Sequence, residues 1–411
     1  MSSSGTFAIV GGGLAGAKAA RTLREEGFEG RVVLIGEEPV NPYERPPLSK
    51  DYLRGESGRE AIWAEPEDYY AEHDIELRTA TSVAKLDAGA AELELEGGER
   101  LRYDKLLLAT GAVPKRLPIP GADLRGVHLL RTVEDSDRLR EAFERTSRLV
   151  VIGGGWIGCE VAASARQKGV EVAMLAPEEV PLERVLGREV GAIYGDLHRR
   201  RGVELVLGSG VEAIEGEGSV SGVRASGGRV LEAELVVMGV GVAPRTELAE
   251  AAGLRVEDGI VVDDRLRTSV ENVLAAGDVA RWRHPLFETS LRVEHWHNAL
   301  EQGPAAARTM LGRDEPYDKV PYFFSDQYDV GMEYAGHNEG FDRVVFRGDP
   351  ASFEFMVFWM RGDRVVAGMN VNVWDVTDDV QALIRSGTAV DEDALRDPDT
   401  PLAELAARAR H

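Results

Sequence analysis

Two copies of one glycine-rich turn constrain this chain more than any other feature. The copies are AIVGGGLAGAKAA at 8–20 and VVIGGGWIGCEVAASA at 150–165. Each is an apolar strand that runs into Gly-x-Gly-x-x-Gly and then into an alanine-rich helical pattern. The first glycine turns the chain tightly, the second lets backbone amides approach a pyrophosphate, and the third lets helix and strand pack closely. One copy is a weak signal, but two copies a domain apart predict two dinucleotides bound by one polypeptide.

Length and composition are those of a globular protein with several domains. The 411 residues leave room for roughly three domains, and the chain is 43% hydrophobic and 29% charged. The formal net charge is −23. Such a chain repels nucleic acid and anionic membrane surfaces unless a local basic patch intervenes, so we expect neither as a partner.

The lack of a recognisable secretory signal and the single cysteine lead us to expect a cytoplasmic protein. The sequence enters its first strand without a basic segment and a long apolar run, and it contains no apolar stretch of about eighteen residues. Cys159 is the single cysteine. The chain therefore cannot build a disulfide framework or a cysteine-ligated metal site by itself, and we interpret Cys159 as a small buried residue.

The duplication extends beyond the glycine loops. The strands VVLIGEE at 32–38 and EVAMLAPEE at 171–179 follow the two helices, and each half then shows a hairpin that turns at a Gly-Gly pair, 97–98 or 227–228. An apolar run follows each hairpin and is typical of a strand buried on both faces. Both halves thus share one plan of βαβ, hairpin, buried strand and Gly-x-x-Pro.

A third glycine element and the C-terminal part complete the predicted fold. The segment TSVENVLAAGDVA at 268–280 is an apolar strand opening into a Gly-Asp turn, which would return the chain to the first domain. The C-terminal part shows alternating β-type runs and then an acidic helical tail. We predict an α/β protein with two Rossmann-like, glutathione-reductase-like dinucleotide-binding domains and a C-terminal mixed α/β domain. The predicted boundaries are 1–112 with 243–319 for the first domain, 113–242 for the second and 320–411 for the third.

Acidic residues after the second strand of each half bear on ribose recognition. Glu37 is placed to accept hydrogen bonds from ribose hydroxyls, although it could also be a solvated turn carboxylate. The equivalent position in the second half is Ala176, and the nearest acids are Glu178 and Glu179. We expect no arginine there to meet a 2′-phosphate, which favours NADH over NADPH.

The segment NPYERPPLSKDYLRG at 41–55 is unusual for a βαβ connection. Its prolines fix the backbone before a helix predicted to begin near Leu48. Arg45 could clamp a pyrophosphate and Lys50 could lie over a cofactor ring. Either side chain could equally be solvated, and the residues alone do not decide.

Several of these motifs together resemble a known family. PYERPPLSK, LLLATGAVP, the doubled GGG loops, VLAAGDVA and EHWHNALEQG, in this order, resemble the ferredoxin or rubredoxin reductase branch of the two-dinucleotide flavoprotein family. The resemblance covers almost the whole chain, and the combination is far more specific than any one motif. It implies FAD in the discontinuous first domain, NAD(P)H in the inserted domain, and a C-terminal domain that frames the flavin.

The resemblance also implies roles for individual residues. For FAD it implies Gly11, Gly13 and Gly16 on the pyrophosphate, Glu37 on the ribose, Arg45 and Arg131 on phosphate or adenosine, Asp278 on the ribityl chain, and Val83 and Gly111 as further contacts. For NADH it implies Gly153, Gly155 and Gly158 on the phosphates, Glu178 on the ribose and Gly241 in the nicotinamide channel.

Three residues carry the implied catalytic roles: Lys50, Glu160 and Trp296. Lys50 would approach the reactive edge of the isoalloxazine, paired with Glu160, and such a pair would compensate a buried charge and set the potential at flavin N5. Trp296 would pack at the ring, or would be a core tryptophan.

The resulting hypothesis is hydride transfer from nicotinamide C4 to flavin N5, followed by electron delivery to an external acceptor. A redox cysteine pair is excluded because the chain has one cysteine. Electrons must then leave the flavin directly, which suits a one-electron carrier such as a ferredoxin or rubredoxin. A local basic rim would dock such an acidic carrier, with Lys50, Arg281, Arg283 and Arg292 as candidates.

Three alternatives stay open at this point. One is a reductase of a small molecule such as a quinone or a radical, and another is an NADH-responsive flavoprotein resembling apoptosis-inducing factor. The third, metal hydrolysis at His295 and His297, is disfavoured because their spacing suits no helical ligand pair, so we expect no metal site. Trp374 could lie near the flavin or at a subunit contact, and the sequence leaves a homodimer open.

Overall fold

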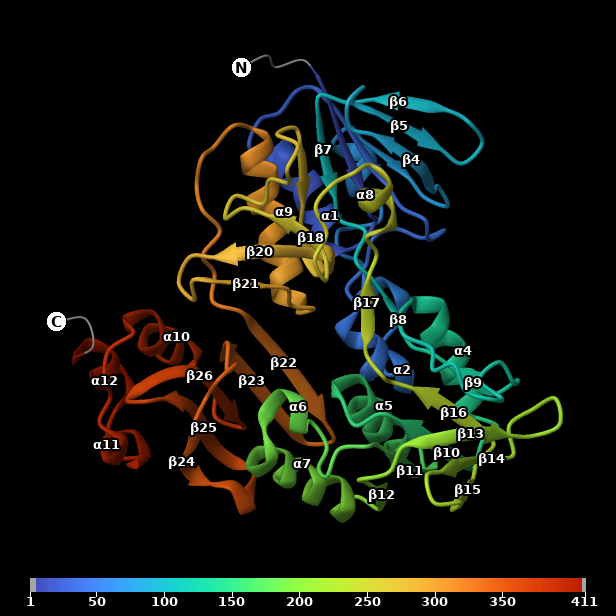
Figure 1. The fold of residues 1–411 in the computed structure, drawn as a ribbon, viewed down its shortest axis with the longest axis vertical. Helices are drawn as coiled ribbons and strands as arrows, with labels where there is room; N and C mark the ends of the chain where they lie inside the picture. The colour runs from blue at the N-terminus through green and yellow to red at the C-terminus, as the bar shows by residue number, and fades with distance from the viewer. Residues whose placement is uncertain (1–4, 409–411) are drawn as a thin grey trace. The chain divides into compact units, whose positions relative to one another are not determined.

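The structure is a computed structural model that describes residues 5–408, and it divides the chain into two compact units (Figure 1). Unit 1 comprises the chain up to Glu44, Arg59–Val113 and Ala243–Pro321. Unit 2 comprises Arg45–Gly58, Pro114–Val242 and the chain from Tyr322 onward.

A parallel five-stranded sheet forms the centre of unit 1. In spatial order its strands are β19 (Val273–Ala275), β7 (Lys105–Leu108), β1 (Thr6–Val10), β2 (Arg31–Ile35) and β3 (Ile75–Arg78). Apart from the edge strand β3, the strands consist mainly of buried apolar residues, as expected for a parallel sheet covered on both faces. β19 belongs to the third glycine element, so the prediction that this segment rejoins the first sheet is confirmed.

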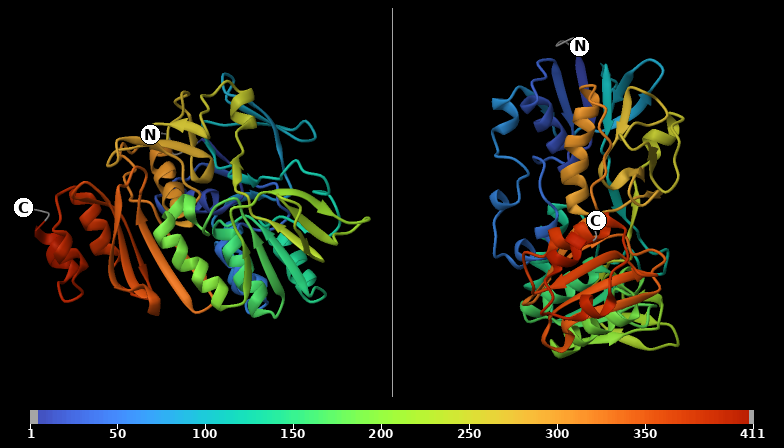
Figure 2. Two further views of the ribbon diagram at one scale, coloured as in Figure 1. Left: turned by 60° about the horizontal axis from the view of Figure 1, so that its bottom comes forward. Right: turned by 90° about the vertical axis from the view of Figure 1, so that its left-hand side faces the viewer.

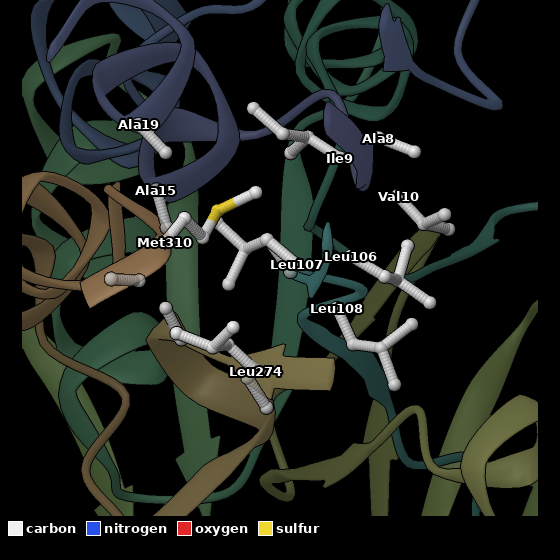
Figure 3. Packing of buried hydrophobic residues seen from close by; sticks show 14 of the residues in the cluster. Ala8, Ile9, Val10, Ala15, Ala19, Leu106, Leu107, Leu108, Leu274 and Met310 are labelled. Atoms are coloured by element: carbon white, nitrogen blue, oxygen red, sulfur yellow. The ribbon is translucent and has the colours of Figure 1, made fainter. Parts of the chain in front are cut away.

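Two helices pack closely over this sheet. They are α1 (Leu14–Glu25), which follows the first glycine loop, and α9 (Trp296–Met310). A Cβ added at Gly303 of α9 would overlap the carbonyl oxygen of Ala15 in α1, so glycine is required for this close approach. Side chains of α1, α9 and the sheet meet in one hydrophobic core (Figure 3).

The remaining elements of unit 1 are small. They are the three-stranded sheets β4 (Val83–Asp87), β5 (Glu92–Leu95), β6 (Arg100–Arg102) and β18 (Ile260–Val262), β20 (Ala280–His284), β21 (Thr289–Leu291), the helices α3 (Tyr69–Glu72) and α8 (Glu247–Ala251), and the 3-10 turns η2 (Arg59–Ala61) and η3 (Gly277–Val279). The predicted hairpin turn at 97–98 is confirmed, because both glycines have positive φ between β5 and β6. β8 (Ala112–Pro114) and β17 (Val242–Pro244) form a two-stranded sheet.

Unit 2 repeats the plan of the first sheet. In spatial order the strands are β12 (Val203–Val206), β11 (Glu171–Leu175), β10 (Arg148–Ile152), β16 (Leu235–Met238) and β9 (Val127–His128). The accompanying elements are α4 (Val133–Phe143), α5 (Trp156–Gln167), α6 (Glu183–Leu186), α7 (Arg188–Arg200), and the hairpin sheet β13 (Val211–Glu215), β14 (Gly222–Ala225), β15 (Val230–Glu232). The second Gly-Gly turn, 227–228, lies between β14 and β15 as predicted.

The proline-rich segment of unit 2 differs from the predicted single helix near Leu48. It forms the 3-10 turn η1 (Pro46–Ser49) and then the four-residue α2 (Asp51–Arg54). The two prolines lack amide donors and fit the first turn only, and Lys50 then breaks the helical backbone with φ −122° and ψ −120°. Gly55, with φ 77°, ends α2 in the left-handed conformation.

The C-terminal part of unit 2 is an antiparallel sheet with helices beside it (Figure 2). Its elements are β22 (Tyr322–Gln327), β23 (Val330–Gly336), β26 (Arg364–Val371), β25 (Glu354–Arg361), β24 (Arg343–Asp349), η4 (Pro350–Ser352), α10 (Thr377–Ser386), α11 (Glu392–Arg396) and α12 (Leu402–Arg408). This confirms the predicted mixed α/β character. Along β22 the side chains alternate, with Phe323, Ser325 and Gln327 buried.

Within residues 5–408, none of the helices is both long enough and apolar enough to cross a bilayer.

Candidate functional site

The first glycine loop requires glycine at its first and last positions, whereas its middle glycine faces open space. Gly11 has φ 128°, and a Cβ there would overlap the carbonyl oxygen of Ala109. A Cβ at Gly16 would overlap the carbonyl oxygen of Gly11. A Cβ at Gly13 would meet nothing within 4 Å. These are the three roles of a dinucleotide loop: a tight bend, close helix packing and room for a ligand.

The second loop reproduces the same pattern in unit 2. Gly153 has φ 109°, and a Cβ there would overlap the carbonyl oxygen of Gly239. A Cβ at Gly158 would overlap the carbonyl oxygen of Gly153, whereas a Cβ at Gly155 would meet nothing within 4 Å. The two loops are therefore equivalent in backbone geometry as well as in sequence.

Both loops lead into helix N-termini suited to an anion. Gly13 caps α1 and Gly155 caps α5, and neither helix has a side-chain cap or an acidic residue in its first turn. The first amides of each helix point along the positive end of the helix dipole, where they favour a phosphate. We call each glycine loop, together with the N-terminus of the helix that follows it, a cradle. With the open space at each middle glycine, both cradles fit the pyrophosphate of a dinucleotide.

The ends of β2 and β11 carry the ribose candidates, and each is paired with an arginine. In unit 1, Arg245 donates to Glu37 over 2.5 Å, and this hydrogen bond holds the pKa of Glu37 below its usual value. In unit 2, Arg184 of α6 lies 2.5 Å from Glu178, measured from Nε to Oε1. Ala176 is fully buried and presents no polar group.

Arg184 corrects one expectation. The sequence predicts no arginine beside the ribose position of the second half, but Arg184 lies there, on a neighbouring helix. Arg184 does not stand at the end of β11 in the sequence. Its side chain reaches Glu178 across the turn that precedes α6. No periodicity or motif in the chain marks this contact.

Lys50 and Glu160 form a buried ion pair within unit 2. The distance from Lys50 Nζ to Glu160 Oε2 is 3.0 Å, and the two residues are 8% and 4% exposed. Lys50 also donates to the carbonyl of Pro46 at 3.0 Å, and its ammonium lies 5.6 Å from the ring centroid of Phe324. The hydroxyl of Ser49 donates to the same carboxylate oxygen. The predicted pairing of these two residues is thus present in the structure.

Other predicted site residues of unit 2 lie as follows. The guanidinium of Arg45 donates to the carbonyl oxygen of Arg131, so these two residues are neighbours. Gly241 has φ 94°, and a Cβ there would meet nothing within 4 Å. Cys159 is fully buried in α5, and burial raises the pKa of its thiol, so the interpretation of Cys159 as a buried structural residue is confirmed.

The predicted residues of unit 1 are spread over several elements. Trp296 is the first residue of α9 and packs against the core, and Asp278 is half-buried in η3. Val83 begins β4 and also packs against the core. Gly111 has φ 72°, and its carbonyl accepts from the amide of Arg245 at 2.9 Å.

Two arginines of the candidate basic rim, Arg281 and Arg292, are engaged in local ion pairs. The side chain of Arg292 is only 10% exposed and pairs with Asp258 and Glu294. Arg281 also lies near Asp258, at 3.8 Å. Because its charge is already compensated and mostly covered, Arg292 is a poor docking residue, whereas Arg283 is exposed.

Comparisons with known proteins agree with this geometry. Residues 5–303 match the pyridine nucleotide-disulphide oxidoreductase family, and residues 322–406 match the reductase C-terminal family. The chain is 40% identical to rhodocoxin reductase of Rhodococcus erythropolis over 89% of this chain and 86% of the relative. It is 38% identical to putidaredoxin reductase CamA of Pseudomonas putida over 100% of this chain and 99% of the relative.

A solved structure shows the same fold over the whole length. The crystal structure of the covalent putidaredoxin reductase–putidaredoxin complex contains a chain that superposes with a TM-score of 0.94 at 38% identity. The match covers 99% of this chain and 99% of that chain. The predicted architecture, two Rossmann-like domains and a C-terminal mixed α/β domain, is confirmed.

Proposed function

The chain belongs to the pyridine nucleotide-disulphide oxidoreductase family, and from this premise we propose that it transfers electrons from NADH through FAD to a ferredoxin-type carrier. The two relatives described above are named as reductases of rhodocoxin and putidaredoxin. Because the chain spans 99% of the putidaredoxin reductase sequence, the likeness extends to the C-terminal domain as well as the nucleotide cradles.

The observation that carries this proposal is the pair of glycine cradles in a chain with one cysteine. Two equivalent loops, each open at its middle glycine, fit two dinucleotides. A disulfide reductase of the same family would need two redox cysteines, and this chain has only the buried Cys159. Bound FAD supplies the hydride acceptor and a one-electron donor, so no thiol relay is needed.

We propose that the first cradle and its domain bind FAD and that the second cradle and its domain bind NADH. In the FAD domain, residues 1–112 and 243–319, the proposed contacts are Gly11, Gly13, Gly16, Glu37, Arg45, Val83, Gly111, Asp278 and Trp296, with Arg131 as a further FAD contact from outside that range. In the NADH domain, residues 113–242, they are Gly153, Gly155, Gly158, Glu178 and Gly241. Residues 320–411 form the proposed C-terminal domain.

The buried ion pair is proposed to serve the flavin. Lys50 presents a positive charge that Glu160 compensates at 3.0 Å, so the charge is retained in a buried position. A fixed ammonium at the reactive edge of a flavin favours the negative charge that reduction places there. Lys50 and Glu160, with Trp296, are therefore the proposed catalytic residues.

The Glu178 and Arg184 pair supports a preference for NADH over NADPH. Glu178 presents a carboxylate where ribose hydroxyls would donate, and the same charge repels a 2′-phosphate. Arg184 could meet a 2′-phosphate only by giving up its ion pair with Glu178. The balance of these charges favours the nucleotide without the extra phosphate.

A carrier panel under anaerobic conditions tests the proposal. The FAD-loaded protein is reduced with NADH and mixed in a stopped-flow instrument with purified ferredoxins, rubredoxins and, as a comparison, a soluble quinone. We expect at least one iron–sulfur carrier to reoxidise the flavin faster than the quinone does. Reoxidation by the quinone alone would instead indicate a small-molecule reductase.

We also propose the cytoplasm as the site of action. A chain of 411 residues with a single cysteine suits a reducing compartment, where disulfides do not contribute to stability. Fractionation of the source cells with an antibody to the protein tests this.

A further inference from the structure

A chain of buried polar side chains leads away from Glu160 through the interior of unit 2. Its members come from α5, β22 and α7, which are far apart in sequence. They are Glu160, Ser325, Gln327 and His198, and each is at most 4% exposed. Tyr328, the residue that follows β22, is the last member.

Consecutive members are joined by hydrogen bonds. Ser325 Oγ donates to Glu160 Oε1 at 2.7 Å, and Gln327 Nε2 donates to Ser325 Oγ at 3.4 Å. His198 Nε2 lies 3.0 Å from Gln327 Oε1, and His198 Nδ1 lies 3.2 Å from the hydroxyl of Tyr328.

The direction of these hydrogen bonds is fixed by the group at each link. A carboxylate only accepts, so Ser325 must donate to Glu160, and the amide NH₂ of Gln327 then donates to Ser325. The amide oxygen of Gln327 is left to accept from His198, which requires a proton on Nε2. His198 Nδ1 is then the acceptor for Tyr328, so every donor in the chain points toward Glu160.

Three donors meet at the carboxylate where the chain ends. Ser325 donates to Oε1, while Ser49 and Lys50 donate to Oε2. A protonated carboxyl would set its own hydrogen against one of these donors, so the arrangement suits the ionised form. Both oxygens are held, and the carboxylate cannot rotate without breaking a hydrogen bond.

We propose that Ser325, Gln327 and His198 are positioning residues that lock the Glu160 carboxylate in place and, through it, the ammonium of Lys50. The proposal rests on the proposed function, in which Lys50 and Glu160 serve the flavin. Without the chain, Glu160 would remain buried but would have only Ser49 and Lys50 to fix one of its two oxygens. A catalytic charge that moves by a fraction of an ångström loses much of its effect on the reaction.

The histidine tautomer tests the chain independently of turnover. In FAD-loaded protein labelled with ¹⁵N-histidine, a long-range ¹H–¹⁵N NMR spectrum at neutral pH distinguishes Nε2–H from Nδ1–H, and loss of the signal in His198→Gln assigns it. We expect the neutral Nε2–H form. The Nδ1–H form would overturn the proposal, because the chain could then no longer point toward Glu160.

Two substitutions test the consequence for the reaction. Ser325→Ala removes the donor to Glu160, and Gln327→Glu keeps the size of the side chain but replaces the donor to Ser325 with an acceptor, which draws the Ser325 proton away from Glu160. Ser136→Ala is the matched control. This fully buried hydroxyl donates to the carbonyl of Leu48 at 2.8 Å and does not belong to the hydrogen-bonded chain that ends at Glu160.

Anaerobic stopped-flow reduction by NADH separates the rate constant of flavin reduction from the dissociation constant of NADH. We expect both variants to lower the rate constant by about tenfold with a nearly unchanged dissociation constant, and the control to match the wild type. Rates within twofold of the wild type in Gln327→Glu would overturn the proposal, even if Ser325→Ala fails to fold. If NADH does not reduce the wild type at all, the proposed function fails, while the tautomer measurement still decides the direction of the chain.

Discussion

The helices that follow the two glycine loops carry largely buried ion pairs of opposite polarity at equivalent positions. Lys18 in α1 and Glu160 in α5 each lie two residues after the third glycine of their loop. Lys18 Nζ lies 2.7 Å from Glu65 Oε1, and Glu160 Oε2 lies 3.0 Å from Lys50 Nζ. The glycine geometry is repeated because backbone sterics demand it, whereas the charge placed on it differs between the halves.

The surroundings of the two ion pairs indicate why the charges differ between the two halves. Lys18 also donates to the carbonyl of Ala64, and Glu65 also accepts from Arg21, so this pair ties the segment around Glu65 to α1 within unit 1. The pair in unit 2 instead ends a directed chain of hydroxyl, amide and imidazole groups. We interpret the first pair as structural and the second as functional, and the following predictions test that distinction.

The largest effects are expected at the glycines, where the halves should behave alike. Gly16→Ala and Gly158→Ala place a methyl group against a backbone carbonyl oxygen, so each should lower the free energy of unfolding by more than about 4 kcal/mol. Gly13→Ala and Gly155→Ala meet open space and should fold. Thermal melting measures the stability of all four variants, and the absorbance of bound flavin shows which of them still bind FAD.

The two variants that are expected to fold, Gly13→Ala and Gly155→Ala, then test which loop binds which dinucleotide. We expect Gly13→Ala to lose FAD and Gly155→Ala to retain FAD but bind NADH more weakly. Loss of FAD in Gly155→Ala would show that the cradles are assigned in the wrong order.

The ion pairs should differ in what they control. Lys18→Met leaves the buried Glu65 with only Arg21, which should cost about 3 kcal/mol of unfolding free energy and leave NADH reduction of the remaining folded protein unchanged. Lys50→Met should slow flavin reduction. Chemical denaturation and anaerobic stopped-flow measurements on both variants check this, and equal effects of both on the reduction rate would contradict the distinction.

A pH dependence of stability is expected from the buried His198 of unit 2. Burial lowers the pKa of His198 to about 4, against an opposing hydrogen bond to Gln327, from about 6.5 when unfolded. The unfolded state therefore binds more protons between these values, so His198 should lower the free energy of unfolding by up to about 3 kcal/mol as the pH falls from 6.5 to 4. Denaturation at a series of pH values measures the slope, and His198→Gln should flatten it. An unchanged slope in that variant would assign the dependence to another group.

The smallest effect concerns the ribose end of the second cradle. Glu178→Ala should weaken NADH binding by about 1 to 2 kcal/mol, because a hydrogen bond to a charged group is lost. Arg184→Ala should leave NADH affinity nearly unchanged, since Arg184 contacts the carboxylate and not the ribose in this scheme. Titration calorimetry with NADH measures both, and unchanged affinity in Glu178→Ala would move the ribose contact elsewhere.

What the sequence predicted well depends on local sterics. The roles of Gly11, Gly16, Gly153 and Gly158 follow from the strand, turn and helix around each of them, and the structure bears out the need for glycine. The hairpin turns could be predicted for the same reason. The return of β19 to the first sheet followed instead from the inference that the residues between about 113 and 242 form an inserted domain.

What the sequence did not reveal depends on contacts across the fold. Ser325 reaches Glu160 from 165 residues away, and no motif marks a serine as the partner of a distant carboxylate. Arg184 is close to Glu178 in sequence, but only the turn into α6 brings their side chains together. The sequence predicts a helix beginning near Leu48, but Lys50 interrupts the helical backbone, and neither a glycine nor a proline stands at that position to indicate the break.

The central claim is that one cradle holds FAD and the other delivers NADH to it. Anaerobic titration of the purified, FAD-loaded protein with NADH, followed by flavin absorbance, tests this most directly. We predict that about one equivalent of NADH bleaches the flavin. A protein that takes up no FAD, or a flavin spectrum that stays oxidised in excess NADH, would contradict the account.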